Sequence, residues 1–338
     1  MLTVLESLPP GLLALEAHEL HRVLAGPTLF HLPGRREPPL FVSVLLHGNE
    51  TTGWIAVREV LRRWEGRSLP RALSLLVGNV AAAREGVRRL DGQPDHNRIW
   101  DGGETPEHHM AREVLEHVRR RGMFAGVDVH NNTGVNPHYA CVNVLDHRHL
   151  HLAALFGRTV VYFIRPASVA SMALSGLGPA VTLECGQPGE PHGIEHAVDY
   201  LTGCLNLLEL PTHPVAESDL DLFHTVAVMT VPPEVEIGFG PGTPGLQLAP
   251  DLDRMNFREL PPGTVLGWTP PGAALPVQVR DESGHDVAAR YLEVDAGELR
   301  THSAFMPSMF TLDLRVIRQD CLGYVMERYR APGPRREA

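Results

Sequence analysis

Three residues with metal-binding side chains lie at the ends of two apolar runs. His47 and Glu50 follow the run 41–46, and a tight glycine turn between them sets them three positions apart at the expected start of a helix. His130 ends the run 126–130. Imidazole nitrogens and carboxylate oxygens are both zinc ligands, and a catalytic zinc site has three protein ligands with one position left for water. Because ligand sites form at the carboxyl ends of strands in open α/β sheets, the pattern predicts that these three side chains bind one catalytic zinc ion.

Two further stretches carry polar groups suited to a substrate or to catalysis. Asn97 and Arg98 are adjacent; an arginine donates two parallel hydrogen bonds to a carboxylate, and an asparagine adds a neutral donor and acceptor. The pair is expected to bind an acidic substrate, with an ion pair from Arg98 to Asp91 or Asp95 as the alternative. Glu184 ends the apolar run 180–184, where a carboxylate is costly to bury unless it is paired or used.

The residues around His130 have open roles. Asp128 shares a strand face with His130, so it either supports that histidine or is a buried structural carboxylate. Asn131 is expected to line the pocket. Asn132 and His138 are expected to lie in a turn.

The elements that would position these residues alternate between strands and helices. Strands are expected at 41–46, 73–79, 126–130, 140–145, 159–164 and 180–185. Helices are expected at 52–64 and 194–210, from apolar residues three and four positions apart, and from Thr105 onward, where a polar cap precedes a proline. Alternating strands and helices predict an α/β fold: a mixed sheet with helices on both sides over residues 1–212.

The chain changes character after about residue 212. Short extended runs at 226–235, 264–268, 276–279, 289–294 and 310–316 are separated by Pro- and Gly-rich turns. This pattern is typical of a small β-rich domain, which we place at 213–338. The tail 331–338 is expected to fray.

The composition excludes several classes of partner. The 338 residues include 30 Lys+Arg, all of them Arg, and 40 Asp+Glu, a net charge of −10 that argues against nucleic acid or an anionic membrane surface. The apolar runs are far shorter than the roughly 20 residues of a membrane-spanning helix. The four cysteines lack paired spacing, so neither a disulfide framework nor a cysteine zinc site is expected. Residues 1–10 lack the features of a secretory signal, so we expect a cytoplasmic location; a homo-oligomer is left open.

Taken in order, the motifs resemble a known family. The series His47-x-x-Glu50, Asn97-Arg98, Asp128-Val-His130 and Thr182-Leu-Glu184 resembles the succinylglutamate desuccinylase/aspartoacylase family of the zinc carboxypeptidase superfamily. The resemblance covers roughly residues 40–190, and the β-rich tail fits the extra C-terminal domain of that family. It implies a zinc-carboxypeptidase-like fold for the first domain.

The resemblance also implies a role for each residue. It implies one zinc ion bound by His47, Glu50 and His130. It implies Glu184 as general base and later general acid, Asn97 and Arg98 as ligands of a substrate carboxylate, and Arg88 as the group that stabilises the oxyanion.

The sequence departs from the family in two places. The segment from Arg88 to Asn97 is two residues longer than usual, with 93–94 as the expected insertion, so Arg84 and Arg89 stay open as alternatives to Arg88. Aspartoacylases also carry an Arg shortly before the base and a Tyr from the C-terminal domain, and we find no counterpart of either at 167–183 or 306–311. The departure argues for an acyl group or amino acid other than those of N-acetylaspartate.

The sequence therefore predicts zinc-dependent hydrolysis of the amide bond of a small N-acyl amino acid or a related acidic compound. A metallocarboxypeptidase is the first alternative, because the same zinc, base and Asn-Arg pair serve both reactions. The β-rich domain favours the deacylase, since it would cover the pocket and exclude long peptides. A non-catalytic metabolite-binding protein is the second alternative, although a sensor has no need of a base such as Glu184.

Overall fold

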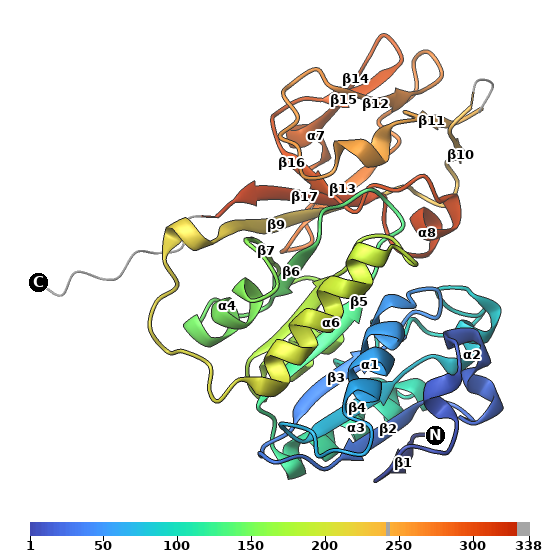
Figure 1. The fold of residues 1–338 in the computed structure, drawn as a ribbon. Helices are drawn as coiled ribbons and strands as arrows, with labels where there is room; N and C mark the ends of the chain where they lie inside the picture. Colours follow the sequence, from blue (N-terminus) through green and yellow to red (C-terminus); the bar gives the residue numbers. More distant parts are fainter. Residues whose placement is uncertain (241–243, 330–338) are drawn as a thin grey trace, which may run out of the picture. The chain divides into compact units, whose positions relative to one another are not determined.

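The computed structural model describes residues 1–240 and 244–329, and the chain divides into two compact units (Figure 1). The N-terminal unit contains Met1–Asn131 and His138–Leu222. The C-terminal unit contains Asn132–Pro137 together with residues 223–329. The tail 331–338, expected to fray, lies outside the described residues.

A mixed sheet forms the centre of the N-terminal unit, in the strand order β1-β2-β4-β3-β5-β8-β6-β7. Strands β4, β3, β5 and β8 run parallel to one another, whereas β2 is antiparallel to β4, and β6 is antiparallel to β8. Their bounds are β1 (Thr3–Leu5), β2 (Thr28–Leu32), β3 (Leu40–Val44), β4 (Leu73–Val77), β5 (Ala125–His130), β6 (Tyr139–Val142), β7 (Thr159–Tyr162) and β8 (Ala180–Glu184). The central strands are buried along their whole length, as expected where helices cover both faces of a sheet.

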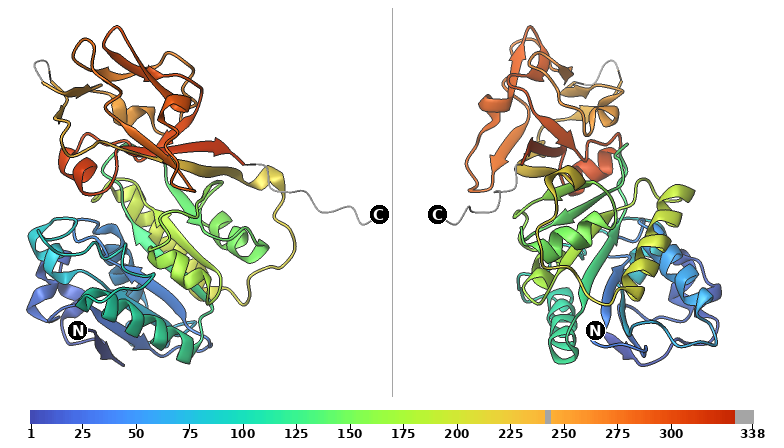
Figure 2. Two further views of the ribbon diagram at one scale, coloured as in Figure 1. Left: turned by 180° about the vertical axis from the view of Figure 1, so that it is seen from behind. Right: turned by 60° about the vertical axis from the view of Figure 1, so that its left-hand side comes forward.

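Helices cover the two faces of this sheet (Figure 2). On one face, α1 (Thr52–Arg63) lies beside α6 (Pro191–Asn206). On the other face, α3 (Pro106–Arg121) and α5 (Ala170–Ser175) pack on the sheet through a hydrophobic cluster that includes Phe41, Val114 and Leu174. The remaining helices of this unit are α2 (Val80–Glu85), α4 (His147–Ala154), η1 (Leu12–Ala14), η2 (Ala17–Arg22) and η3 (Glu217–Asp219).

The predicted α/β fold is therefore confirmed. Each of the six expected strands is present within a few residues of its expected bounds, and Thr105 caps α3 by accepting a hydrogen bond from the His108 N–H. The third expected helix is α6, which begins three residues before the predicted start and ends at Asn206. Strands β1 and β2 and the short helices α2, α4 and α5 were not predicted.

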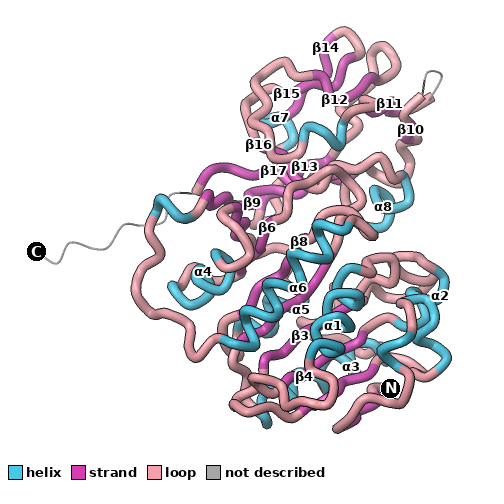
Figure 3. Tube along the Cα trace, in the orientation of Figure 1, coloured by secondary structure: helices cyan, strands magenta, loops and turns pink. Residues whose placement is uncertain are grey.

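The C-terminal unit is built mostly of strands and loops (Figure 3). One group pairs in the order β13-β9-β17-β16, and a second sheet has the order β10-β11-β12-β15-β14. A shared hydrophobic cluster that includes Met229, Leu266 and Phe310 packs between them. The strands are β9 (Asp221–Thr230), β10 (Ile237–Gly238), β11 (Leu246–Leu248), β12 (Val265–Trp268), β13 (Gln278–Asp281), β14 (Leu292–Asp295), β15 (Glu298–Thr301), β16 (Met306–Ser308) and β17 (Gly323–Arg328), and the helices are η4 (Leu252–Met255), α7 (Ala288–Tyr291) and α8 (Leu314–Gln319).

Three of the expected extended runs in this unit are wrong in whole or in part. Residues 226–235 form a strand only up to Thr230. Residues 289–294 begin in the one-turn helix α7 and become a strand only at Leu292. Residues 310–316 form no strand: a loop leads to α8 at Leu314, where the Asp313 side chain accepts hydrogen bonds from the N–H groups of Arg315 and Val316 and so caps a helix.

The segment Asn132–Pro137 is held in the C-terminal unit by side chains from residues far away in the sequence. Asn256 is buried and donates to the carbonyls of Val135 and Phe310, and its Oδ1 accepts from the Phe310 N–H. A Cβ atom at Gly134 would collide with the Phe310 carbonyl oxygen, so a glycine is needed there. This segment leaves the N-terminal unit directly after Asn131.

Within residues 1–240 and 244–329, no helix combines the length and the apolar character needed to cross a membrane.

Candidate metal centre and active site

The predicted ligands meet at the carboxyl ends of adjacent parallel strands. The turn that carries His47 and Glu50 follows β3 and leads into α1, and His130 is the last residue of β5, which pairs with β3. The turn passes so close to α2 that a Cβ atom at Gly48 would collide with the Ala82 backbone. Glycine at this position thus lets the turn direct both side chains inward.

His47, Glu50 and His130 form one buried group. One potential ligand atom from each lies within 4.8 Å of the others. Glu50 Oε1 is 2.7 Å from His47 Nδ1, and Glu50 Oε2 is 2.7 Å from His130 Nδ1. The Nδ1 atoms of both histidines therefore face the same carboxylate, within reach of one shared ion.

Two further carboxylates hold the opposite nitrogens of the histidines. Asp95 Oδ1 is 3.0 Å from His47 Nε2, and Asp128 Oδ2 is 2.8 Å from His130 Nε2. Ser43 Oγ in turn donates to Asp128 Oδ1 at 2.7 Å. With a metal bound at Nδ1, these carboxylate acceptors would hold the remaining proton of each histidine on Nε2, which is how histidines that bind zinc are usually oriented. The donor set and its orientation fit a zinc ion with three protein ligands.

The electrostatics of the cluster agree with this arrangement. Burial alone would raise the pKa of Glu50, but the neighbouring His47 and His130 hold it well below its usual range. Burial alone would lower the pKa of His130, but Asp128 and Glu50 raise it well above the usual value, so a zinc ion would have to displace the proton that faces Glu50. Glu50 is thus an ionised carboxylate, the form that binds a metal.

Arg88 lies beside this cluster, and the two alternative arginines make other contacts. The Arg88 guanidinium pairs with Asp95 at 3.0 Å, and Arg88 Nη1 is 3.7 Å from Glu50 Oε1. Arg84 is exposed and pairs with Glu85 at 3.4 Å, whereas Arg89 donates to the Gln93 carbonyl. Of the three arginines, Arg88 is therefore the one that lies next to a predicted metal ligand, Glu50.

Asn97 also lies against the cluster. Its Oδ1 accepts a hydrogen bond from the Ala170 N–H at 2.9 Å, and its Nδ2 is 3.3 Å from His130 Nε2. The backbone bond fixes the orientation of the amide, so that the NH2 group faces the histidine. Arg98 donates to the Asn97 carbonyl. Burial alone would raise the pKa of Asp95, but His47, Arg88 and, to a smaller extent, Arg98 hold it well below its usual range.

Glu184 stands directly beside the third ligand. In the register of β5 and β8, His130 and Glu184 are partners, so their side chains point to the same face of the sheet. Glu184 is buried. Burial, together with the nearby Glu184 carboxylate, raises the pKa of the thiols of Cys141 and Cys185 well above their usual value, which keeps both thiols neutral and unreactive.

Sequence reasoning did not identify Asp95 as a support for a ligand, and it left Asp128 open between two roles. Asp128 does contact His130, as its position two residues earlier on the strand allows. Asp95 was considered only as a partner of Arg98. Its place two residues before Asn97 is the signal for its location, but its bond to His47 depends on a contact across 48 residues.

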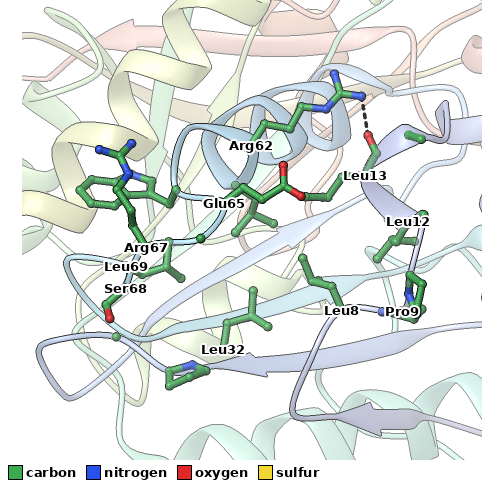
Figure 4. A pocket seen from close by; sticks show the side chains of 18 residues that line it. Leu8, Pro9, Leu12, Leu13, Leu32, Arg62, Glu65, Arg67, Ser68 and Leu69 are labelled. Carbon is green, nitrogen blue, oxygen red and sulfur yellow. Dashed lines mark hydrogen bonds between the residues drawn. The ribbon is translucent and has the colours of Figure 1, made fainter.

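A cavity lies elsewhere in the N-terminal unit. It measures about 850 Å³ and is lined by the segment 8–14, residues 32–34 and the end of α1 with the loop after it (Figure 4). Arg62 at its rim donates to the Leu13 carbonyl. None of the predicted site residues lines this cavity, so it is separate from the metal centre.

Comparisons with known proteins agree with the fold. The family described as the succinylglutamate desuccinylase/aspartoacylase catalytic domain matches residues 37–210, just over half of the chain. A comparison with curated protein sequences found no match.

Several solved structures resemble this one. A succinylglutamate desuccinylase from Chromobacterium violaceum has 23% identity and a TM-score of 0.58, with 88% of this chain and 87% of that chain covered. Murine aminoacylase 3 has 18% identity and a TM-score of 0.53, over 87% of this chain and 97% of that one. The product-bound ectoine utilization protein EutE (DoeB) from Ruegeria pomeroyi has 14% identity and a TM-score of 0.56, over 88% and 95%. These likenesses show a shared fold, and the match over residues 37–210 shows that the chain belongs to the succinylglutamate desuccinylase/aspartoacylase family.

Proposed function

We propose that this protein is a zinc-dependent amidohydrolase that removes the acyl group from a small N-acyl amino acid. The main support is the arrangement of His47, Glu50 and His130, with both Nδ1 atoms turned to one point and a buried Glu184 on the neighbouring strand. The family match also supports a deacylase. Solved structures of similar fold include a succinylglutamate desuccinylase and an aminoacylase.

Zinc, when bound by these three residues, supplies a Lewis acid and lowers the pKa of a bound water to about 7. Glu184 accepts a proton from the attacking water as the new carbon–oxygen bond forms. The same carboxyl group then donates that proton to the leaving amine nitrogen as the carbon–nitrogen bond breaks. The products are a carboxylate and a free amino acid, so atoms and charge balance without another reactant.

Asn97 and Arg98 bind the carboxylate of the amino acid in this proposal. The Asn97 amide already directs its donor toward His130, because the Ala170 N–H occupies its oxygen. Arg88 Nη1 lies 3.7 Å from the ligand Glu50. In this proposal it donates a hydrogen bond to the substrate carbonyl oxygen as that oxygen gains negative charge.

The substrate is a small acidic molecule in this proposal. Residues 167–183 contain no Arg, and residues 306–311 contain no Tyr, so the two groups that aspartoacylases use for the side chain of N-acetylaspartate have no counterparts there. We therefore propose a different acyl group or amino acid.

A cytoplasmic location and the absence of nucleic-acid and membrane partners remain predictions, and a homo-oligomer remains open.

The experiment is amide hydrolysis by the zinc-loaded protein across N-acyl amino acids and peptides with free carboxyl termini. Glu184→Gln is the test variant, and Glu195→Gln, which changes an exposed carboxyl on α6, is the matched control. Turnover of acyl amino acids that Glu184→Gln abolishes and Glu195→Gln retains would support the proposal. Turnover of peptides alone would identify a carboxypeptidase. No turnover despite one bound zinc per chain would contradict both and favour a binding protein.

A further inference from the structure

Asn131 connects three parts of the active site, although it binds neither a metal nor a substrate in the proposed reaction. It directly follows His130, and its side chain is buried. Its backbone N–H donates to Glu50 Oε2 at 3.1 Å. The residue after one ligand therefore orients the carboxylate of another.

The Asn131 side chain also completes the start of α1. Thr51 precedes this helix without making a side-chain capping bond. Asn131 Oδ1 accepts instead from the Thr52 N–H at 3.2 Å, and Asn131 Nδ2 donates to Thr52 Oγ1 at 2.9 Å. A helix begins with N–H groups that need partners, so an asparagine from β5's end fixes the position at which α1 follows Glu50.

The second hydrogen of the same amide reaches the turn that follows Glu184. Asn131 Nδ2 donates to the Gly186 carbonyl at 2.9 Å. Gly186 has φ +72°, and a Cβ atom there would lie 2.8 Å from Glu190 Oε2, so the turn is tight. One residue earlier, the Cys185 N–H donates to the His130 carbonyl at 3.0 Å. These bonds tie the end of β8 to the end of β5.

We propose that Asn131 is a positioning residue that holds the ligand Glu50 and the base Glu184 in one fixed geometry. The amide oxygen and one amide hydrogen bind Thr52, the other amide hydrogen binds Gly186, and the backbone N–H binds Glu50. An alanine would leave the Thr52 N–H and the Gly186 carbonyl without these buried partners. The inference deepens the proposed function and rests on it for the role of Glu184.

The test compares Asn131→Ala with Asn143→Ala. Asn143 is also a buried asparagine, and its Nδ2 donates to the Phe163 carbonyl at 3.0 Å, with no recorded bond to a predicted ligand. Zinc affinity is measured on the metal-free proteins by competition with a chromophoric chelator, and kcat and KM are measured at saturating zinc. For Asn131→Ala we expect affinity and kcat each to fall by about 10–100-fold, with KM nearly unchanged. Asn143→Ala should lower only the thermal stability.

A second variant serves if Asn131→Ala does not fold. Thr52→Val removes only the Oγ1 acceptor of the Asn131 amide and preserves the shape of the side chain, so smaller losses in zinc affinity and kcat are expected. The inference would be overturned if the variant that folds lost thermal stability as Asn143→Ala does but kept wild-type zinc affinity and kcat. A wild-type protein that binds zinc and hydrolyses nothing would refute the proposed function, while the chelator competition would still decide the role of Asn131 toward Glu50.

Discussion

Replacing Asp128 by asparagine tests whether the outer carboxylates prepare the histidines for a metal. Asp128 is fully buried, and its two oxygens bind His130 Nε2 at 2.8 Å and Ser43 Oγ at 2.7 Å. The asparagine side chain would have the same shape but would no longer carry the charge that keeps the proton on Nε2. We therefore expect His130 to present its Nδ1 lone pair less often and zinc to bind less tightly.

The size of the effect follows from the loss of one such support. Removing a partner of this kind costs about 10–100-fold in metal affinity, which is about 1.4–2.7 kcal/mol. At a zinc concentration of 100 times the wild-type dissociation constant, the metal stabilises the wild type by about 2.7 kcal/mol. A 100-fold weaker variant at the same concentration would be stabilised by only about 0.4 kcal/mol.

The assay is thermal unfolding with and without zinc. For a unit of this size, about 1 kcal/mol corresponds to roughly 2–4 °C in Tm. Zinc should therefore raise the Tm of the wild type by about 5–10 °C, and that of Asp128→Asn by about 1 °C for a 100-fold loss of affinity or about 3–6 °C for a 10-fold loss. The zinc-induced rise is compared within each protein, which removes any loss of stability without metal. Glu282→Gln, which changes a carboxylate 2.7 Å from the non-ligand His224, is the control. Equal rises in wild type and Asp128→Asn would refute the reasoning.

Three other variants test separate parts of the structure. Arg98→Met should raise KM about 10–100-fold and change kcat little, because a lost bond to a charged group costs about 1.5–3 kcal/mol; steady-state kinetics would contradict this if kcat alone fell. Burial lowers the pKa of His31 from 6.5 to about 4 in the folded chain, so the unfolded chain takes up a proton at a higher pH than the folded chain does. The free energy of unfolding should therefore be at its full value above about pH 6.5 and should fall, by at most about 3 kcal/mol, as the pH drops to 4. Urea unfolding between pH 4 and 7 should show this slope in the wild type and a shallower one in His31→Phe; equal slopes would exclude His31 as the source. Asn256→Ala should destabilise the C-terminal unit by about 2–4 kcal/mol, because buried backbone groups lose their partners; a change below about 0.5 kcal/mol in urea unfolding would show that those groups find other partners.

The core of the N-terminal unit was predictable because its strands are buried on both faces and read as continuous apolar runs. The strands β3, β5 and β8, which lead to the proposed ligands and the proposed base, were found in this way, and the pairing of β5 with β8 places His130 beside Glu184. β2 was missed. Its run 28–32 contains His31, which is uncharged in the folded chain because burial lowers its pKa, and a sequence does not display that change of polarity.

The supporting residues were harder to predict because their roles depend on contacts between distant segments. Asp95 binds His47 across 48 residues, and Asn131 binds Thr52 and Gly186 across 79 and 55. The ligand types and spacing identify which side chains can bind a metal, but they do not identify which carboxylate lies behind each imidazole. The error at 310–316 has a local origin, since the cap at Asp313 outweighed the extended character of the run before it.

The place of Asn132–Pro137 in the C-terminal unit has a consequence for biosynthesis. That unit is assembled from two pieces of chain, and the first leaves the ribosome about 190 residues before the last described strand is complete. Phe310 lies 173 residues after Pro137, so at about 5–20 residues per second the loop that follows His130 waits roughly 9–35 s until both Asn256 and Phe310 have been made. The loop that directly follows the third proposed ligand therefore acquires these partners only after every residue of the proposed site, the last of which is Glu184, has been synthesised.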